Sequence, residues 1–247
     1  MDYTAFYKKQ ISLTEWFQKI NSPLIEAIRE EDNGQKKRLK ELHSLMQLPI
    51  DESFIFPATE VAQKTAAITE FIHSRGEKLI ALRLTPNDPA LPKYRIRGIT
   101  TAKALEWFNE QPIKPELYKA EFGAHSETVT FTTIFVANRN GIFGEIIHGM
   151  PLKLTQGLYA ENEKPILFAF DYHQLILEPD NAEAKEEVKH IIQCLYVTNE
   201  EIQKQVQEKM NVKFHQNYLQ GYFETATTPE EGLTFLDYNR LLGEKFS

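Results

Sequence analysis

The stretch Tyr218–Gly243, YLQGYFETATTPEEGLTFLDYNRLLG, predicts two strands joined by a turn. Residues 227–232, TTPEEG, supply the turn, because Pro, Gly and small hydroxyl residues interrupt regular structure. Side chains alternate between the two faces of a strand, so we expect Phe235, Asp237 and Asn239 on one side of the second strand. A carboxylate and an amide on one side of an apolar strand need polar partners. The hairpin is therefore a candidate binding site.

The first strand of the hairpin offers a third polar side chain. Glu224 can join Asp237 and Asn239 in a set of three oxygen donors. Such hard donors beside a cationic side chain, here Arg240, suit Mg²⁺ and phosphate. The alternative for this stretch alone is a surface hairpin whose polar side chains meet water.

Composition limits the classes of function. The 247 residues suffice for one large domain or two small ones, and a net charge of −7 disfavours a general nucleic-acid-binding surface. Cys194 is the only cysteine, which excludes an internal disulfide and a cysteine metal cluster and fits a reducing cytosol. There is no signal-like apolar core at the N-terminus and no apolar run near the ~20 residues of a membrane span. We expect a cytoplasmic protein.

The pattern of elements changes near residue 76. Residues 1–76 read as helical, and residues 77–247 read as a strand-rich body, which together predict an α+β fold. The basic run 35–40, QKKRLK, is expected to be a solvated helix face, with a phosphate or RNA contact as the alternative. In the body, alternating residues predict strands and apolar residues at helical spacing predict helices. The expected strands are 78–85, 118–122, 128–136, 142–148, 152–157 and 165–171, and the expected helices are 101–111, 181–196 and 198–211.

In this order the body resembles the ATP-grasp fold. Residues 141–149, GIFGEIIHG, are similar to the Gly-Leu-Gly-Glu run of phosphoenolpyruvate synthase and pyruvate phosphate dikinase. The resemblance covers about residues 78–243 and implies ATP-grasp-like mixed sheets with flanking helices, preceded by an N-terminal helical segment. Residues 235–240 fit in two registers. In the synthase register Tyr238 replaces a metal-binding Gln, whereas in the general ATP-grasp register Asp237 and Asn239 are the ligands.

The resemblance also implies roles for residues outside the hairpin. Arg83 would contact the α-phosphate, Arg95 and Arg97 would lie where the fold has a phosphate-covering loop, and Glu121 would face the ribose hydroxyls. Glu145 would support the nucleotide or the metal. Arg83, Glu145 and Arg240 are thus the expected catalytic residues, Mg²⁺ and ATP the expected cofactors. For each of these side chains a solvated surface position is the alternative.

Three classes of function remain open on this basis, one of them a scaffold that acts through the N-terminal helices, for which only the unexplained extension speaks. The Asp237/Asn239 pair and the arginines favour an ATP-dependent phosphotransferase or ligase. The lack of a glycine-rich loop, together with Tyr238, favours a degenerate, non-catalytic binding or regulatory subunit. The related dikinases use a phosphohistidine domain and a phosphoenolpyruvate-binding barrel, so we expect a protein partner to supply what this chain does not. His148 is expected to be structural.

Overall fold

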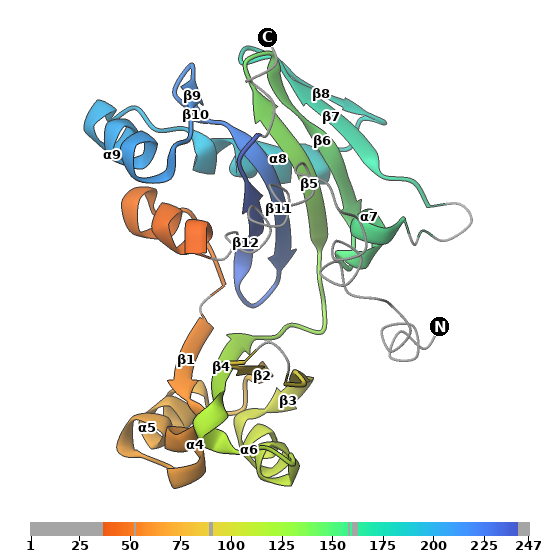
Figure 1. The fold of residues 1–247 in the computed structure, drawn as a ribbon. Coiled ribbons are helices and arrows are strands. Elements are labelled where there is room, and N and C mark those ends of the chain that lie inside the picture. The colour runs from red at the N-terminus through yellow and green to blue at the C-terminus, as the bar shows by residue number, and fades with distance from the viewer. Residues whose placement is uncertain (1–36, 52, 89–90, 158, 160–162, 242–247) are drawn as a thin grey trace, which may run out of the picture.

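The computed structural model describes residues 37–51, 53–88, 91–157, 159 and 163–241. Figure 1 shows them in two lobes, each built on its own sheet. We call residues 53–124 the small lobe, and residues 37–50 together with 131–241 the large lobe. The expected α+β class is confirmed.

The small lobe is a four-stranded antiparallel sheet with helices packed on one face. Ile80, Leu82 and Leu84 alternate along one strand and pack against helix residues such as Phe71, whose ring lies 5.0 Å from that of Phe122. The strands, in spatial order, are β1 (Ser53–Pro57), β4 (Tyr118–Ala124), β2 (Leu79–Pro86) and β3 (Tyr94–Thr100). The helices are α4 (Ala58–Gln63), α5 (Ala66–Arg75), α6 (Thr101–Glu110) and the short η1 (Pro115–Leu117).

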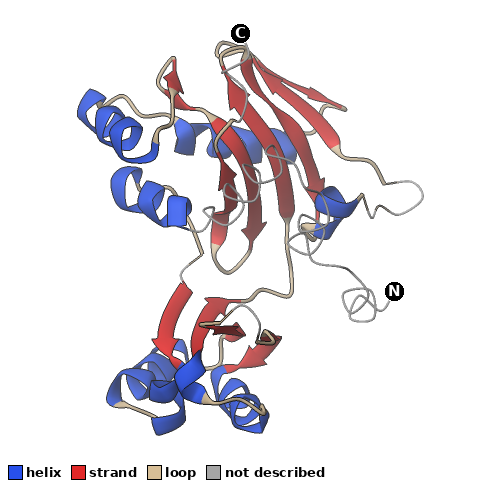
Figure 2. Cartoon of the chain, in the orientation of Figure 1, coloured by secondary structure: helices blue, strands red, loops and turns tan. Residues whose placement is uncertain are grey.

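The large lobe is a six-stranded antiparallel sheet, and Figure 2 shows helix running behind it. The strands, in spatial order, are β12 (Gly232–Asn239), β11 (Gly221–Thr228), β5 (Phe131–Asn138), β6 (Gly141–His148), β7 (Ile166–Phe170) and β8 (Leu175–Glu178). The remaining elements are α7 (Leu152–Gln156), α8 (Ala182–Leu195), α9 (Glu200–Met210) and the small hairpin of β9 (Phe214–His215) with β10 (Tyr218–Leu219).

One face of the large sheet carries the core. Val188, Ile191 and Leu195 recur at helical spacing on α8 and are buried in one cluster with sheet residues such as Phe135 and Phe223. The rings of Phe135 and Phe223 stack with centroids 5.0 Å apart. The amphipathic α8 therefore fixes which face of the sheet is inside, and we call the opposite face the open face.

Residues 37–50 belong with the large sheet. Leu39, Leu42 and Leu48 are buried in the core of the large lobe. The backbone N–H of Phe235 donates to Pro49 O at 2.8 Å, and Ile50 forms a parallel bridge with Phe235. Apart from this isolated bridge, the strand pairs within both lobes are antiparallel, so the sheets themselves are not mixed as we expected.

Several sequence predictions are confirmed and others are wrong. The hairpin of β5 and β6 and the helices α8 and α9 lie where expected. Residues 152–156 form a helix instead of a strand, because Pro151 (φ −51°) starts helical backbone there. Strand β1 lies within residues 1–76, which we expected to be helical, so that expectation is wrong for residues 53–57, while residues 1–36 lie outside the described residues. The four-residue strand β8 is missing from the expectation. Within the described part of the chain no helix is both long and apolar enough to cross a membrane.

Candidate functional site

A β-bulge in β12 sets the orientation of the hairpin's polar side chains. Glu224 pairs with Asp237, but the next residue of β11, Thr225, pairs with Phe235, so Leu236 is the extra residue. Our expectation that Phe235 shares a face with Asp237 and Asn239 is therefore wrong. Phe235 is buried among the rings of the core, whereas the two polar side chains lie on the opposite, open face.

The open face gathers the polar residues of both strands. Glu224 and Asp237 are directly opposed, and Tyr222 is directly opposed to Asn239. Opposed residues have Cβ atoms about 4.5–5.5 Å apart. The Tyr222 hydroxyl donates to Glu224 Oε1 at 2.8 Å. Burial raises the pKa of Tyr222, and the Glu224 and Asp237 carboxylates raise it further.

This cluster has the chemistry of a hard-cation site. In the described residues no group of three or more His, Cys, Asp or Glu side chains is placed to hold a metal. The set here consists of two carboxylates and one amide oxygen, which Mg²⁺ accepts while keeping water and phosphate as further ligands. The two carboxylates are directly opposed across β11 and β12, and such a pair of like charges is stabilised by a cation between them. The residues present therefore fit Mg²⁺.

Arg38 joins this cluster from the helix at residues 37–46. Its Nη2 donates to Asn239 Oδ1 at 3.3 Å, and the contact is partly buried. We expected the basic run at 35–40 to be a solvated helix face, with a phosphate contact as the alternative. Lys37 and Lys40 are exposed as expected, but Arg38 is not. The signal that could have identified it is its spacing of one and four residues from the buried Leu39 and Leu42.

Tyr238 and Arg240 occupy different environments from those of the cluster. Tyr238 is fully buried on the core face, where its ring lies 5.0 Å from that of Phe223 and its hydroxyl donates to Gln220 O at 3.2 Å. That position favours the general register, in which Asp237 and Asn239 are the ligands. Arg240 follows the strand, and its Nη1 donates to Met210 O, at the end of α9, at 3.4 Å. A phosphate contact of Arg240 stays a prediction.

Glu145 lies on the same open face of the large sheet. It pairs with Ile134, which pairs with Glu224, so the three residues form one row across β6, β5 and β11. Glu145 is half-buried. Burial raises the pKa of Tyr159, and the nearby Glu145 carboxylate adds to that rise. Glu145 therefore lies on the same face and in the same row as Glu224, with strand β5 between the two residues.

The other predicted residues collect on the open face of the small sheet. Arg83 pairs with Arg95 on one side and with Glu121 on the other, and Arg97 pairs with Ala81 in the next row. The Arg83 Nη1 lies 3.6 Å from Glu121 Oε2. Arg95 and Arg97 are exposed on strand β3 itself. Three guanidinium groups on one face are a suitable surface for phosphate oxygens.

The tip of the β11–β12 hairpin links the two lobes. Ser126, in the connection between the lobes, donates to the Glu230 carboxylate, and Lys78 of the small lobe lies 3.9 Å from Glu231. The backbone N–H of Thr130 donates to Thr227 O at 2.7 Å. The strands that carry Glu224 and Asp237 are thus tied to the small lobe through their turn.

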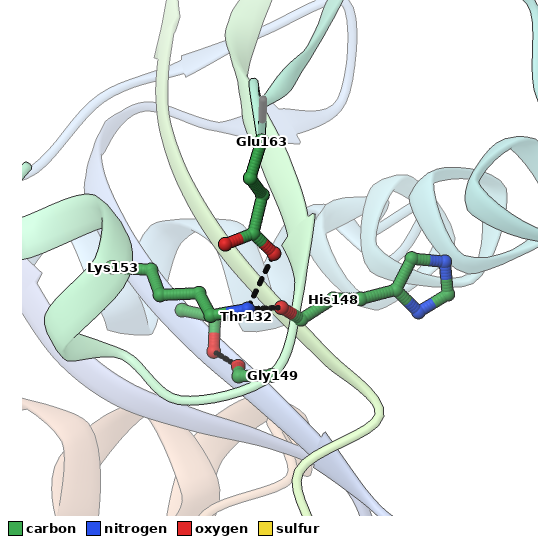
Figure 3. A network of polar contacts seen from close by, with 5 residues as sticks. All are labelled: Thr132, His148, Gly149, Lys153 and Glu163. Atoms are coloured by element: carbon green, nitrogen blue, oxygen red, sulfur yellow. Dashed lines mark hydrogen bonds and ion pairs between the residues drawn. The ribbon is translucent and has the colours of Figure 1, made fainter. Parts of the chain in front are cut away.

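His148 lies in a separate polar network at the end of β6 (Figure 3). Its backbone carbonyl accepts a hydrogen bond from Lys153 Nζ at 2.9 Å, and Lys153 also pairs with Glu163. Thr132 Oγ1 donates to Gly149 O at 2.6 Å. Figure 3 shows the imidazole pointing away from these contacts, and its ring lies 4.2 Å from that of Phe131. The network holds α7 against β5 and β6.

No family model matches the chain, and no curated protein matches it. Among solved structures it is similar to macrocyclase MdnC bound with precursor peptide MdnA from Microcystis aeruginosa MRC, at 14% identity over 84% of this chain and 53% of that one, with a TM-score of 0.39. It is similar to D-cycloserine synthetase DcsG, at 11% identity over 87% and 64%, with a TM-score of 0.41.

A third structure is the ATP-grasp ligase PsnB complexed with minimal precursor, Mg and ADP, at 12% identity over 95% of this chain and 59% of that one, with a TM-score of 0.37. The chain spans between about half and two thirds of the length of these solved proteins.

Proposed function

We propose that this chain binds Mg-ATP in the manner of an ATP-grasp protein and uses it for phosphoryl transfer or ligation to an acceptor. The observation that carries the proposal is the set of Glu224, Asp237 and Asn239 on the open face of the large sheet, held there by the bulge at Leu236. The arginine-rich face of the small sheet supports it, because a nucleotide needs both a cation site and phosphate contacts.

The roles follow from the chemistry of each side chain. Glu224, Asp237 and Asn239 would hold Mg²⁺, which when bound neutralises charge on the phosphates. Arg83, Arg95, Arg97 and Arg240 would bind phosphate oxygens, and Arg38 adds a fifth guanidinium at the metal end. Glu121 would accept hydrogen bonds from ribose hydroxyls, and Glu145 would support the nucleotide or the metal. The chain's part in catalysis is then positioning and charge stabilisation, without a covalent nucleophile.

We further propose kinship with the nucleotide-binding domain of phosphoenolpyruvate synthase, supported by residues 141–149. A partner protein would then supply the phosphohistidine and acceptor domains. The lone Cys194 is consistent with a cytoplasmic location for this reaction.

A non-catalytic binding or regulatory subunit is the second candidate. The observation that favours it is the engagement of predicted phosphate ligands with the protein itself, since Arg83 pairs with Glu121 and Arg240 contacts Met210 O. The Arg83–Glu121 pair is partly exposed, at 42% and 27% of the side chains, and solvent screening limits its contribution to about 0–1 kcal/mol. A phosphate could therefore displace Glu121 at little cost, which favours the first candidate.

Calorimetric titration with a non-hydrolysable ATP analogue tests the proposal. We expect binding in the presence of Mg²⁺ and an affinity at least about tenfold lower in EDTA, because the carboxylates then repel the phosphates. Absence of binding under both conditions would contradict the proposal. Slow formation of ADP from ATP would favour the enzyme, whereas binding without ADP formation would favour the subunit.

Arg83→Ala should weaken ATP binding by about ten- to a hundredfold and leave adenosine binding unchanged. A charge-assisted hydrogen bond contributes roughly 1.5–3 kcal/mol. Adenosine has no phosphate, so it makes no such bond with Arg83 and its affinity should not change. Titration of both ligands measures the difference. Arg139→Ala, in the exposed turn between β5 and β6, is the matched control and should change neither affinity. Equal losses for ATP and adenosine would show that Arg83 acts through folding.

A further inference from the structure

The distal half of the large sheet exposes large apolar side chains on its open face. Phe143 on β6 is 40% exposed, Leu167 on β7 is 50% exposed and Ile176 on β8 is 58% exposed. We call these three residues the apolar strip. Single exposed apolar residues are normal on soluble proteins, but several together on one face mark an interaction surface.

The strand register places the three residues side by side. Phe143 pairs with Ala169, and Ala169 pairs with Ile176, so Phe143 and Ile176 stand in one row on the same face. Leu167 lies two residues from Ala169 on β7, so it projects from that face as well. Their neighbours on the same strands, such as Ile142, Phe168 and Leu177, point to the opposite face and are buried in the core.

Carboxylates flank the apolar strip. Leu167 pairs with Glu145 on one side and with Glu178 on the other, so it stands between two glutamates in a single row. Asp180 follows shortly after β8, but it lies 3.8 Å from Lys185 Nζ, so among the described residues only the two glutamates contribute unshared charge here. The surface thus combines apolar anchors with negative charge at the adjacent positions.

We propose that the apolar strip is a docking surface for a segment of another protein in which apolar side chains are interspersed with Lys or Arg. The apolar side chains would cover Phe143, Leu167 and Ile176, and the cations would pair with Glu145 and Glu178. Nucleic acid and anionic lipid are disfavoured because the carboxylates repel both. The surface shares Glu145 with the proposed nucleotide site, whereas Glu178 and the apolar strip lie outside that site.

A second copy of this chain is a poorer occupant for two reasons. A two-fold symmetric contact places the same patch on both sides, so the glutamates of one copy would face those of the other. The outer edge strand β8 is also only four residues long and is followed by Pro179, which limits strand pairing along that edge.

Fluorescence anisotropy with two labelled synthetic peptides tests the docking surface. Both peptides share the same Leu and Phe positions, and the intervening positions are Lys in one and Glu in the other. We expect the Lys peptide to bind the wild-type chain without nucleotide and the Glu peptide to bind at least about tenfold more weakly. The double variant Leu167→Thr/Ile176→Thr should lose about tenfold or more of the Lys-peptide affinity, because it removes apolar contact area and keeps every charge.

Matched controls separate docking from general attraction to an acidic protein. Ile55→Thr removes an apolar side chain that is 51% exposed on a strand of the small lobe, and it should leave the affinity unchanged. Glu178→Gln should lower the affinity for the Lys peptide and make that affinity less dependent on salt. Unfolding curves confirm that each variant is folded. Equal binding of the Lys peptide to wild type and to the double variant would overturn the proposal, and so would a dimer of the chain that the double variant abolishes.

Discussion

The double variant Glu224→Gln/Asp237→Asn should abolish Mg²⁺-dependent binding of ATP. Both substitutions keep the size of the side chain and remove its charge, so they take away two negative ligands from one cross-strand cluster. Interactions that involve a charged group contribute roughly 1.5–3 kcal/mol each, so the expected loss is on the order of a hundred- to ten-thousandfold in affinity. Titration of the ATP analogue at saturating Mg²⁺ measures it.

The same variant should still fold. Both side chains lie on the open face of the sheet, away from the core, and Tyr222 can donate to a glutamine oxygen as it does to Glu224. Glu208→Gln, an isosteric change at an exposed position of α9, is the control and should bind as wild type does. Undiminished Mg²⁺-dependent binding in the double variant would remove this cluster from consideration as the metal site.

Tyr238→Ala should destabilise the large lobe by about 3–5 kcal/mol, the range found when a buried aromatic side chain is truncated. The ring is fully buried and packs on Phe223. It also lies so close to Gly221 that a side chain at residue 221 would clash with it. The hydrogen bond of its hydroxyl to Gln220 O is lost as well. Urea unfolding followed by circular dichroism measures the change in free energy of unfolding.

Tyr238→Phe separates the two contributions and tests the register. It keeps the ring and removes the hydroxyl, so we expect a loss of about 1 kcal/mol and an unchanged affinity for Mg-ATP. If Tyr238 stood in a ligand position, the phenylalanine variant would instead lose Mg²⁺-dependent binding at unchanged stability. That outcome would restore the synthase register that the buried ring argues against.

Elements with strong local signals could be predicted from sequence. The turn at residues 138–141, the caps Asn181 and Asn199 and the apolar spacing of α8 are each encoded within a few neighbouring residues. The short strand β1 depends on β4, a partner distant in sequence, so no local pattern identifies it. Strand β8 pairs with β7, which directly precedes it, but its four residues are too few to show a clear alternation. The polar residues of the hairpin were likewise recognisable from their residue types alone.

The remaining features of the site depend on long-range contacts. Arg38 contacts Asn239 across 201 positions of sequence, and a basic helix face by itself does not reveal such a contact. The bulge at Leu236 is set by the pairing of β12 with β11, which decides the face of Asp237 only once both strands are in place. Strict alternation therefore predicted the partnership of Asp237 and Asn239 correctly and that of Phe235 incorrectly.

The bulge at Leu236 also bears on how relatives of this chain would be recognised. A protein with a regular strand at this point would have one residue fewer between the buried Phe235 and the acidic position. An alignment that matches the two strands without a gap would then set Tyr238 against a metal ligand and score the site as lost. Opening a one-residue gap at Leu236 brings Asp237 and Asn239 back into correspondence. A comparison that penalises gaps inside strands will thus classify a retained site as a degenerate one.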